Sequence, residues 1–257
     1  MKVIKRSLGE FPQIEILPLA DLHIGDIHSD GKKIQEWLAY IEKTENCFCI
    51  LNGDLMNVAI KSSISDTYLE TLTPMNQLEQ CVKLFGPIAH KVLAVCGGNH
   101  ESRIWRQDGL DVTAMLCNQL NLGDLYSPES VLIFVTFGKQ NGKHNYYPMT
   151  YGIYCTHGAG GGRREGGKLN RLVDLSNVCD ADVYVHSHSH LPLIAKTSYY
   201  RTFAPRRSVE QVDRLFINTS SSLSYGGYGE VQSYRPNSLE TPLILLDGTK
   251  RGLRALL

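Results

Sequence analysis

One stretch of the sequence constrains the fold more than any other, because it joins a buried strand to a group of polar side chains. The run over residues 91–95 is apolar and β-branched, which predicts the strand. Gly97 and Gly98 follow, and glycines let a backbone turn sharply and come close to another segment. The next three side chains, Asn99-His100-Glu101, would then lie at a sheet edge, where α/β proteins bind ligands. Taken alone, the stretch also fits an ordinary glycine-rich turn before a helix.

The residues before this stretch predict alternating strands and helices. Apolar runs over 14–20 and 47–51 predict two strands. Between them, Asp30-Gly31 opens a helix, and a second helix is predicted over 74–91. The apolar residues of the first helix recur at helical spacing: Ile34, Trp37, Leu38 and Ile41. The β-α-β-α-β order predicts a largely parallel half.

The second half of the chain is predicted to be richer in hairpins. Strands over 131–137 and 147–155 flank Asn141-Gly142, a hairpin signal. Further strands are expected over 181–185, at Leu193, and over 215–217 and 243–246, with a helix over 111–120 and irregular segments over 56–72 and 225–229. The 257 residues show no repeat and no clear linker, so we expect one domain over residues 1–257.

Composition excludes several classes of protein. Lys+Arg and Asp+Glu both number 26, so the net charge gives no indication of nucleic acid or an anionic membrane as a partner. No apolar run is long enough to span a bilayer, and the N-terminal residues lack the apolar core of a signal peptide. The seven cysteines lie mostly in apolar runs without a Cys-x-x-Cys motif, which predicts reduced, buried thiols. We therefore expect a soluble, cytoplasmic protein.

Polar side chains follow five of the predicted strands directly. The five groups are Asp21 with His23, Gly53-Asp54, Gly98-Asn99-His100-Glu101, Thr156-His157-Gly158, and the alternating histidines His186, His188 and His190. Residues two apart in an extended segment point to the same side, so His188 and His190 could grip from one direction. Imidazole and oxygen ligands without thiolate suit Mn²⁺, Fe, Zn²⁺ or Ni²⁺. About seven ligands are too many for one tetrahedral zinc, and they suit two adjacent ions bridged by a carboxylate.

In this order, the groups resemble the motifs of the calcineurin-like metallophosphoesterases over the span from Asp21 to His190. The family pattern is Asp-x-His, Gly-Asp, Gly-Asn-His-(Asp/Glu), His and Gly-His-x-His. Two departures are Ser187, where the family has glycine, and Asn57, where relatives often carry an acidic residue. The resemblance implies an α/β fold, a four-layer α/β/β/α sandwich with its metal site at the ends of the central strands.

The resemblance also implies roles for the motif residues. One ion would be held by Asp21, His23, Asp54 and His190, and the other by Asp54, Asn99, His157 and His188. Two divalent cations are thus expected as cofactors, Mn²⁺ first, with Fe, Zn²⁺, Ni²⁺ or Mg²⁺ as alternatives. Asp54 would bridge them and share in catalysis, and a water between the ions would become the nucleophile. His100 would protonate the leaving oxygen or hold the phosphate, and Glu101 would orient a histidine.

Arginines near the motifs are candidate contacts for the substrate. Arg163 and Arg164 lie in a glycine-rich loop after His157, and Arg103 lies shortly after Glu101. Guanidinium groups bind phosphates by forked hydrogen bonds, although the loop could equally be solvated and open a helix. The basic and aromatic segment over 196–214 could follow a nucleic-acid strand or form a solvated hairpin surface.

We therefore expect a phosphoesterase with two metal ions, acting as a phosphodiesterase or nuclease on nucleic acid or nucleotides. The segment Asp21-Leu22-His23-Ile24-Gly25 resembles the DNA-repair exonuclease branch of the family. A phosphomonoesterase is the alternative, because Gly-Asn-His-Glu also occurs in the protein phosphatases of the family. A non-catalytic protein-binding scaffold is the third reading, although every ligand position is filled. A cap over the site is sought in residues 56–72 or 138–147.

Overall fold

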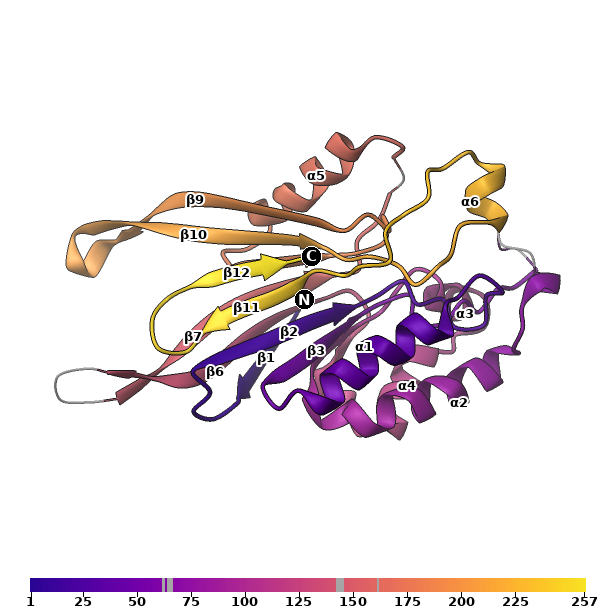
Figure 1. Cartoon of the computed structure of the whole chain (residues 1–257), viewed down its shortest axis with the longest axis horizontal. Coiled ribbons are helices and arrows are strands. Elements are labelled where there is room, and N and C mark those ends of the chain that lie inside the picture. The colour runs from indigo at the N-terminus through magenta and orange to yellow at the C-terminus, as the bar shows by residue number, and fades with distance from the viewer. Residues whose placement is uncertain (62, 64–66, 142–145, 161) are drawn as a thin grey trace.

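Two six-stranded sheets lie face to face in the computed structural model, which describes residues 1–61, 63, 67–141, 146–160 and 162–257 (Figure 1). The first sheet has the order β12 (Leu253–Leu256), β11 (Leu243–Asp247), β2 (Gln13–Leu19), β3 (Cys47–Asn52), β4 (Val92–Cys96) and β5 (Tyr126–Ser127). The second has the order β1 (Lys2–Ser7), β6 (Ser130–Asn141), β7 (Tyr146–Thr156), β8 (Val183–His186), β10 (Ser208–Asn218) and β9 (Leu193–Phe203).

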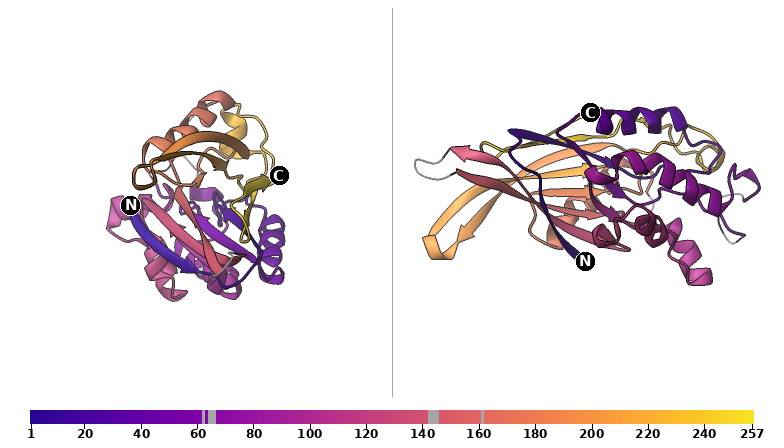
Figure 2. Two further views of the ribbon diagram at one scale, coloured as in Figure 1. Left: turned by 90° about the vertical axis from the view of Figure 1, so that its left-hand side faces the viewer. Right: turned by 90° about the horizontal axis from the view of Figure 1, so that it is seen from below.

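Helices cover the outer faces of the two sheets. The first sheet carries α1 (Gly31–Lys43), α2 (Pro74–Phe85), α3 (Glu101–Asp108) and α4 (Val112–Gln119), while α5 (Glu165–Asp174) lies against the second. Apolar side chains fill each space: α1 to α4 against the first sheet, the two sheets against each other, and α5 against the second sheet. Seen end-on, α5 lies on the opposite side of the sheets from α1 to α4 (Figure 2). The four-layer α/β/β/α sandwich is thereby confirmed.

The predicted parallel half is also present. Strands β2, β3 and β4 pair in parallel, and all six residues of β3 are buried because both of its faces are covered. Helix α1 begins where the sequence indicated, since Asp30 Oδ1 accepts from the N–H groups of Lys32 and Lys33 at 3.0 Å. The described part of 56–72 is irregular apart from a 3₁₀ turn over Thr67–Leu69.

Several elements differ from the expectation. The helix predicted over 74–91 ends at Phe85, because Gly86-Pro87 interrupts it and the chain continues as a 3₁₀ turn. Residues 225–229, expected as a loop, run into the short helix α6 (Gly227–Val231). Strand β1 was not predicted, because it is a polar edge strand with little alternation.

Both long hairpins point away from the ends of the parallel strands. Strand β7 pairs antiparallel with β6, as predicted, although most of the proposed turn lies in residues 142–145, outside the described part of the chain. Because β7 ends beside His157 and has 11 residues, its beginning lies about 35 Å away. The described residues of 138–147, one of the two stretches considered for a cap, therefore lie at the end of this hairpin remote from the site. Strand β10 likewise ends near the site, so the β9–β10 turn lies at the far end (Figure 1).

The seven thiols should be almost inert in the native protein. All are free, six are buried and Cys179 is half-buried, as the sequence predicted. Burial raises the pKa of every thiol, that of Cys96 to about 12, so little reactive thiolate exists at neutral pH. We expect a thiol reagent to label Cys179 first, faster as the pH rises, and the other six only after unfolding. Rapid labelling of several cysteines in the native protein would contradict this packing.

Among the described residues, no helix combines the length and the apolar character needed to cross a membrane.

Candidate metal centre

The predicted ligands come together where strands of both sheets end. Asp21 and His23 follow β2, and the other groups follow β3, β4, β7 and β8. Parallel strands present their carboxyl ends at one edge, so the facing sheets bring five separate segments to one place. The side chains gathered there are Asp21, His23, Asp54, Asn99, His100, His157, His188 and His190.

Two glycines allow the strand exits to meet. A Cβ on Gly98 would lie 2.1 Å from the backbone nitrogen of Asp54, and one on Gly53 would lie 2.8 Å from the carbonyl oxygen of Gly97. Any side chain at Gly98 would therefore displace the Asp54 loop. The close approach that the sequence predicted for Gly97-Gly98 is thus confirmed, and its partner is the loop that carries Asp54.

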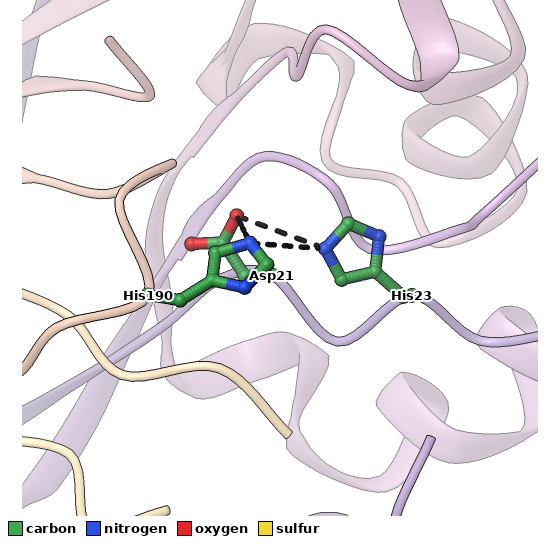
Figure 3. A group of neighbouring side chains, drawn as sticks. All are labelled: Asp21, His23 and His190. Carbon is green, nitrogen blue, oxygen red and sulfur yellow. Dashed lines mark hydrogen bonds and ion pairs between the residues drawn. The ribbon is translucent and has the colours of Figure 1, made fainter. Parts of the chain in front are cut away.

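Asp21, His23 and His190 form the first cluster, in which three ligand atoms converge (Figure 3). His190 Nε2 lies 3.2 Å from Asp21 Oδ1 and 3.4 Å from His23 Nε2. Asp21 Oδ1 is fully buried and finds no hydrogen-bond partner among the described residues, and burial keeps the pKa of His23 well below its usual value. Electron-rich oxygen and nitrogen atoms that converge in a buried site fit a bound cation.

Asp54, His157 and His188 form the second cluster, which Asn99 completes. His157 Nε2 lies 3.2 Å from Asp54 Oδ2, and Asn99 Oδ1 lies 3.1 Å from the same nitrogen and 2.7 Å from His188 Nδ1. A further grouping of His23, Asp54 and His100 overlaps both clusters. The overlapping clusters, with Asp54 between them, are consistent with a dinuclear metal site.

The charges of the site also favour bound cations. Burial opposes ionisation of Asp54, but the nearby His157 and His100 hold its pKa well below the usual value. Burial likewise opposes the charged form of His157, yet the Asp54 and Asp21 carboxylates raise its pKa to about 10. Two buried carboxylates thus draw positive charge to this nitrogen, and a divalent cation would supply that charge in place of a proton.

Most of the ligand positions have an unusual backbone. Asp21, His23, Asp54, His188 and His190 all have positive φ, between 46° and 64°. Non-glycine residues rarely adopt this left-handed region, and each such residue costs about 1–3 kcal/mol. The prediction that His188 and His190 grip from one direction is wrong: this backbone is not extended, and the two imidazoles join different clusters.

A shell of buried polar groups, which sequence reasoning largely missed, orients the ligands. His157 Nδ1 donates to the Asn52 carbonyl oxygen at 2.8 Å, which leaves Nε2 free to face the centre. Ser187, which replaces the family glycine, accepts from Asn52 Nδ2 at 2.7 Å. His186 is buried and donates from Nδ1 to Asn218 Oδ1 at 2.8 Å, so it supports the site without entering either cluster. The only sequence signal for these residues is their place at the strand ends.

Glu101 has partners other than the expected histidine. Among the described residues, its carboxylate accepts hydrogen bonds from the backbone N–H groups of Met56 at 2.9 Å and Asp54 at 3.2 Å. Burial and the Asp54 carboxylate raise the pKa of Glu101 to about 7. Glu101 therefore fixes the loop that carries Asp54, and its hydrogen bonds reach no imidazole.

His100 lies at the edge of both clusters. Its Nδ1 donates to the Asn57 carbonyl oxygen at 3.1 Å, which directs Nε2 toward the centre, 3.7 Å from Asp54 Oδ2. Its ring meets that of His23 edge-on at 4.3 Å, and 16% of its side chain is exposed. The Asn57 side chain turns away from His100, toward Asp26 and Glu70. His100 is thus held by a backbone carbonyl, with a face open to a bound molecule.

Comparison with known proteins agrees with this geometry. A family described as "Calcineurin-like phosphoesterase" matches residues 22–192, which is more than half of the chain. The chain belongs to the calcineurin-like phosphoesterase family. It is therefore a metal-dependent phosphoesterase, and the family span begins next to Asp21 and ends just after His190. No curated protein matches the chain.

Two solved structures resemble this phosphoesterase over most of their length. One is a conserved uncharacterized protein from Streptococcus pneumoniae TIGR4, a predicted phosphoesterase, with 14% identity, a TM-score of 0.39, and coverage of 95% of this chain and 89% of the other. The second is a metallophosphoesterase from Sphaerobacter thermophilus, with 10% identity, a TM-score of 0.40, and coverage of 91% and 84%. At such low scores the assignment of the fold depends on the two sheets described above.

The predicted substrate arginines of the phosphoesterase lie on α3 and directly before α5. Arg103 lies on α3 and is half-buried, and its Nη1 donates to Ser63 Oγ at 3.4 Å. Arg163 and Arg164 are exposed at the start of α5, and Arg163 lies 5.8 Å from the ring of Tyr234. A further cation, Lys168 of α5, donates to the carbonyl oxygen of Ser189, between the ligands His188 and His190.

Proposed function

We propose that this phosphoesterase uses two divalent cations, Mn²⁺ in the first place, to hydrolyse phosphodiesters of nucleotides or nucleic acid. The observation that carries the metal-dependent part is the fully buried Asp21 Oδ1, which has no hydrogen-bond partner among the described residues and faces two imidazole nitrogens. Asp21, His23, Asp54 and His190 would hold one cation, and Asp54, Asn99, His157 and His188 the other. When bound, the cations would supply Lewis acidity that lowers the pKa of water and neutralises phosphate oxygens.

The protein's own groups would position the ester and move protons. His100 Nε2 faces the centre and would protonate the leaving oxygen or hold the phosphate. Arg103, Arg163 and Arg164 would neutralise phosphate oxygens from the helices beside the site. Asn52 and Glu101 would keep His157 and the Asp54 loop in place, so that the polar atoms need not reorganise during the reaction.

The β9–β10 hairpin gives little support to a long nucleic-acid strand as substrate. Arg201 and Arg214 both lie 2.7 Å from Asp180, and Lys196 lies 2.8 Å from Asp213, so these cations are paired with carboxylates. The remaining basic pair, Arg206-Arg207, lies at the turn remote from the centre. Substrates of nucleotide size therefore fit the charge distribution better than a polymer bound along this hairpin.

A phosphomonoester is the second candidate substrate. Arg103 on α3 and the pair Arg163-Arg164 before α5 offer more positive charge than a singly charged diester requires, and a monoester carries up to two negative charges.

A direct comparison of substrates tests these alternatives. We expect the Mn²⁺-loaded protein to hydrolyse bis(p-nitrophenyl) phosphate faster than p-nitrophenyl phosphate, and single-stranded DNA slowly. Turnover of the monoester alone would reject the phosphodiesterase proposal. If no ester is hydrolysed while two ions are bound, the result would favour the hypothesis of a non-catalytic protein-binding scaffold. Repeating the assay with Zn²⁺, Fe²⁺, Ni²⁺ and Mg²⁺ tests the choice of Mn²⁺.

A further inference from the structure

A cavity of about 570 Å³ adjoins the metal centre on one side. It lies between α3, the turn that joins β5 to β6, the end of β7 and α5. Asn99 and His157, which belong to the second cluster, form part of its wall. Its volume falls within the range of about 300–1,000 Å³ that small-molecule sites occupy. A phosphate bound at the centre could therefore carry its organic group into this cavity.

The lining combines apolar surface with three charged groups. Pro128, Tyr154 and Leu175 supply the apolar part. Arg171 and Asp174, one turn apart on α5, and Glu129 supply one positive and two negative charges. Two carboxylates against one guanidinium oppose a second phosphate or a polyanion at this place. The lining instead suits an uncharged group with an apolar ring and N–H or O–H donors.

The guanidinium of Arg171 is fixed beside the loop that follows β7. Its Nη1 donates to the Ala159 carbonyl oxygen at 3.4 Å, and a Cβ on Gly160 would lie 2.5 Å from that nitrogen. Gly160 has a φ of +90°, a conformation that favours glycine there. A guanidinium beside a loop offers a planar surface on which a ring can stack, and Asp174, which also lines the cavity, offers an acceptor one turn along α5.

We propose that this cavity binds the uncharged organic group of the phosphate ester, with the size and donor groups of one nucleoside. The proposal rests on the proposed function for the position of the phosphate, and it adds the chemical class of the group that determines specificity. Arg171 stacks on the ring, Asp174 accepts its hydrogen bonds, and Tyr154 with Leu175 covers its apolar edge.

Filling the cavity tests the proposal. Leu175→Trp places a larger side chain in the wall, whereas Leu169→Trp changes α5 at an exposed position outside the lining and serves as the matched control. Thymidine 5′-phosphate and inorganic phosphate are titrated into the Mn²⁺-loaded proteins. We expect the nucleotide to bind the wild type at least about tenfold more tightly than phosphate, and Leu175→Trp to abolish this difference. Phosphate affinity and Mn²⁺ content should stay unchanged.

A second variant guards against misfolding of the first. Arg171→Gln removes the exposed guanidinium and should weaken nucleotide binding about tenfold without affecting phosphate. Equal affinities for nucleotide and phosphate in the wild type, or unchanged nucleotide binding in both variants, would overturn the proposal. Because nucleotide affinity and ester hydrolysis are separate measurements, the cavity can fail while ester hydrolysis succeeds, and the converse result is equally visible.

Discussion

Asp54→Asn should lose bound metal and activity together. Asp54 belongs to the second cluster and to the grouping that overlaps the first, and it lies 3.2 Å from His157 Nε2. Its pKa is well below the usual value, so its carboxylate is ionised. The amide of Asn keeps the shape of the carboxylate but removes its negative charge. Its NH₂ group would also point a hydrogen-bond donor toward the imidazole of His157. Metal affinity should fall by at least about 100-fold, since even residues that only support a ligand are worth about 10–100-fold. The rate at saturating Mn²⁺ should fall by about 10³-fold.

Metal analysis and ester hydrolysis on the same samples check this expectation. Asp108→Asn, at an exposed position on α3, is the matched control and should retain both properties. Circular dichroism should show a folded protein for both variants, because the amide of Asn has the same shape as the carboxylate of Asp. An Asp54→Asn protein with full metal content and normal rate would refute the bridging role of Asp54.

His100→Ala should separate metal binding from catalysis. The ring lies at the edge of both clusters and is held through Nδ1 by the Asn57 carbonyl oxygen. Its loss should leave the metal content intact while the rate falls by about 10²–10⁴-fold, the usual contribution of a general acid or base. His90→Ala, at an exposed position away from the centre, should change neither property.

The leaving group distinguishes the two roles proposed for His100. If the imidazole protonates the leaving oxygen, the loss should be larger for an alkyl ester than for a nitrophenyl ester, whose leaving group needs no proton. If it holds the phosphate, both esters should lose rate equally, and KM should rise. Loss of metal from His100→Ala would instead make His100 a ligand, in line with its grouping with His23 and Asp54.

The sequence predicted the parts of the fold that depend on local pattern. The apolar runs of β2, β3 and β4, the Asp30 cap of α1 and the close approach at Gly98 all follow from propensity and sterics. The position of Asp21, Asp54 and His157 directly after predicted strands was sufficient to predict that they lie close together, because parallel strands end at the same edge of a sheet.

The remaining features depend on contacts between distant segments. Nothing local to Asn52 indicates that its carbonyl oxygen orients His157, more than 100 positions away, and nothing near Glu101 indicates that it binds the Asp54 loop. The extended-strand argument failed at His188 for a related reason, since its backbone N–H donates to Asp21 Oδ2 of a distant segment at 2.9 Å and its φ is +64°. The ion pair between Arg214 and Asp180 likewise could not be predicted, because it depends on the β9–β10 hairpin lying beside the loop before β8.

The left-handed ligand positions have a consequence for anyone who engineers this protein. Glycine would occupy Asp21, His23, Asp54, His188 and His190 more comfortably than the residues that nature has placed there. Selection for thermal stability alone would therefore favour substitutions to glycine at these positions, and the resulting protein would be more stable but inactive. Variant libraries of this protein therefore need a screen for activity at every round, so that the residues at those five positions are retained.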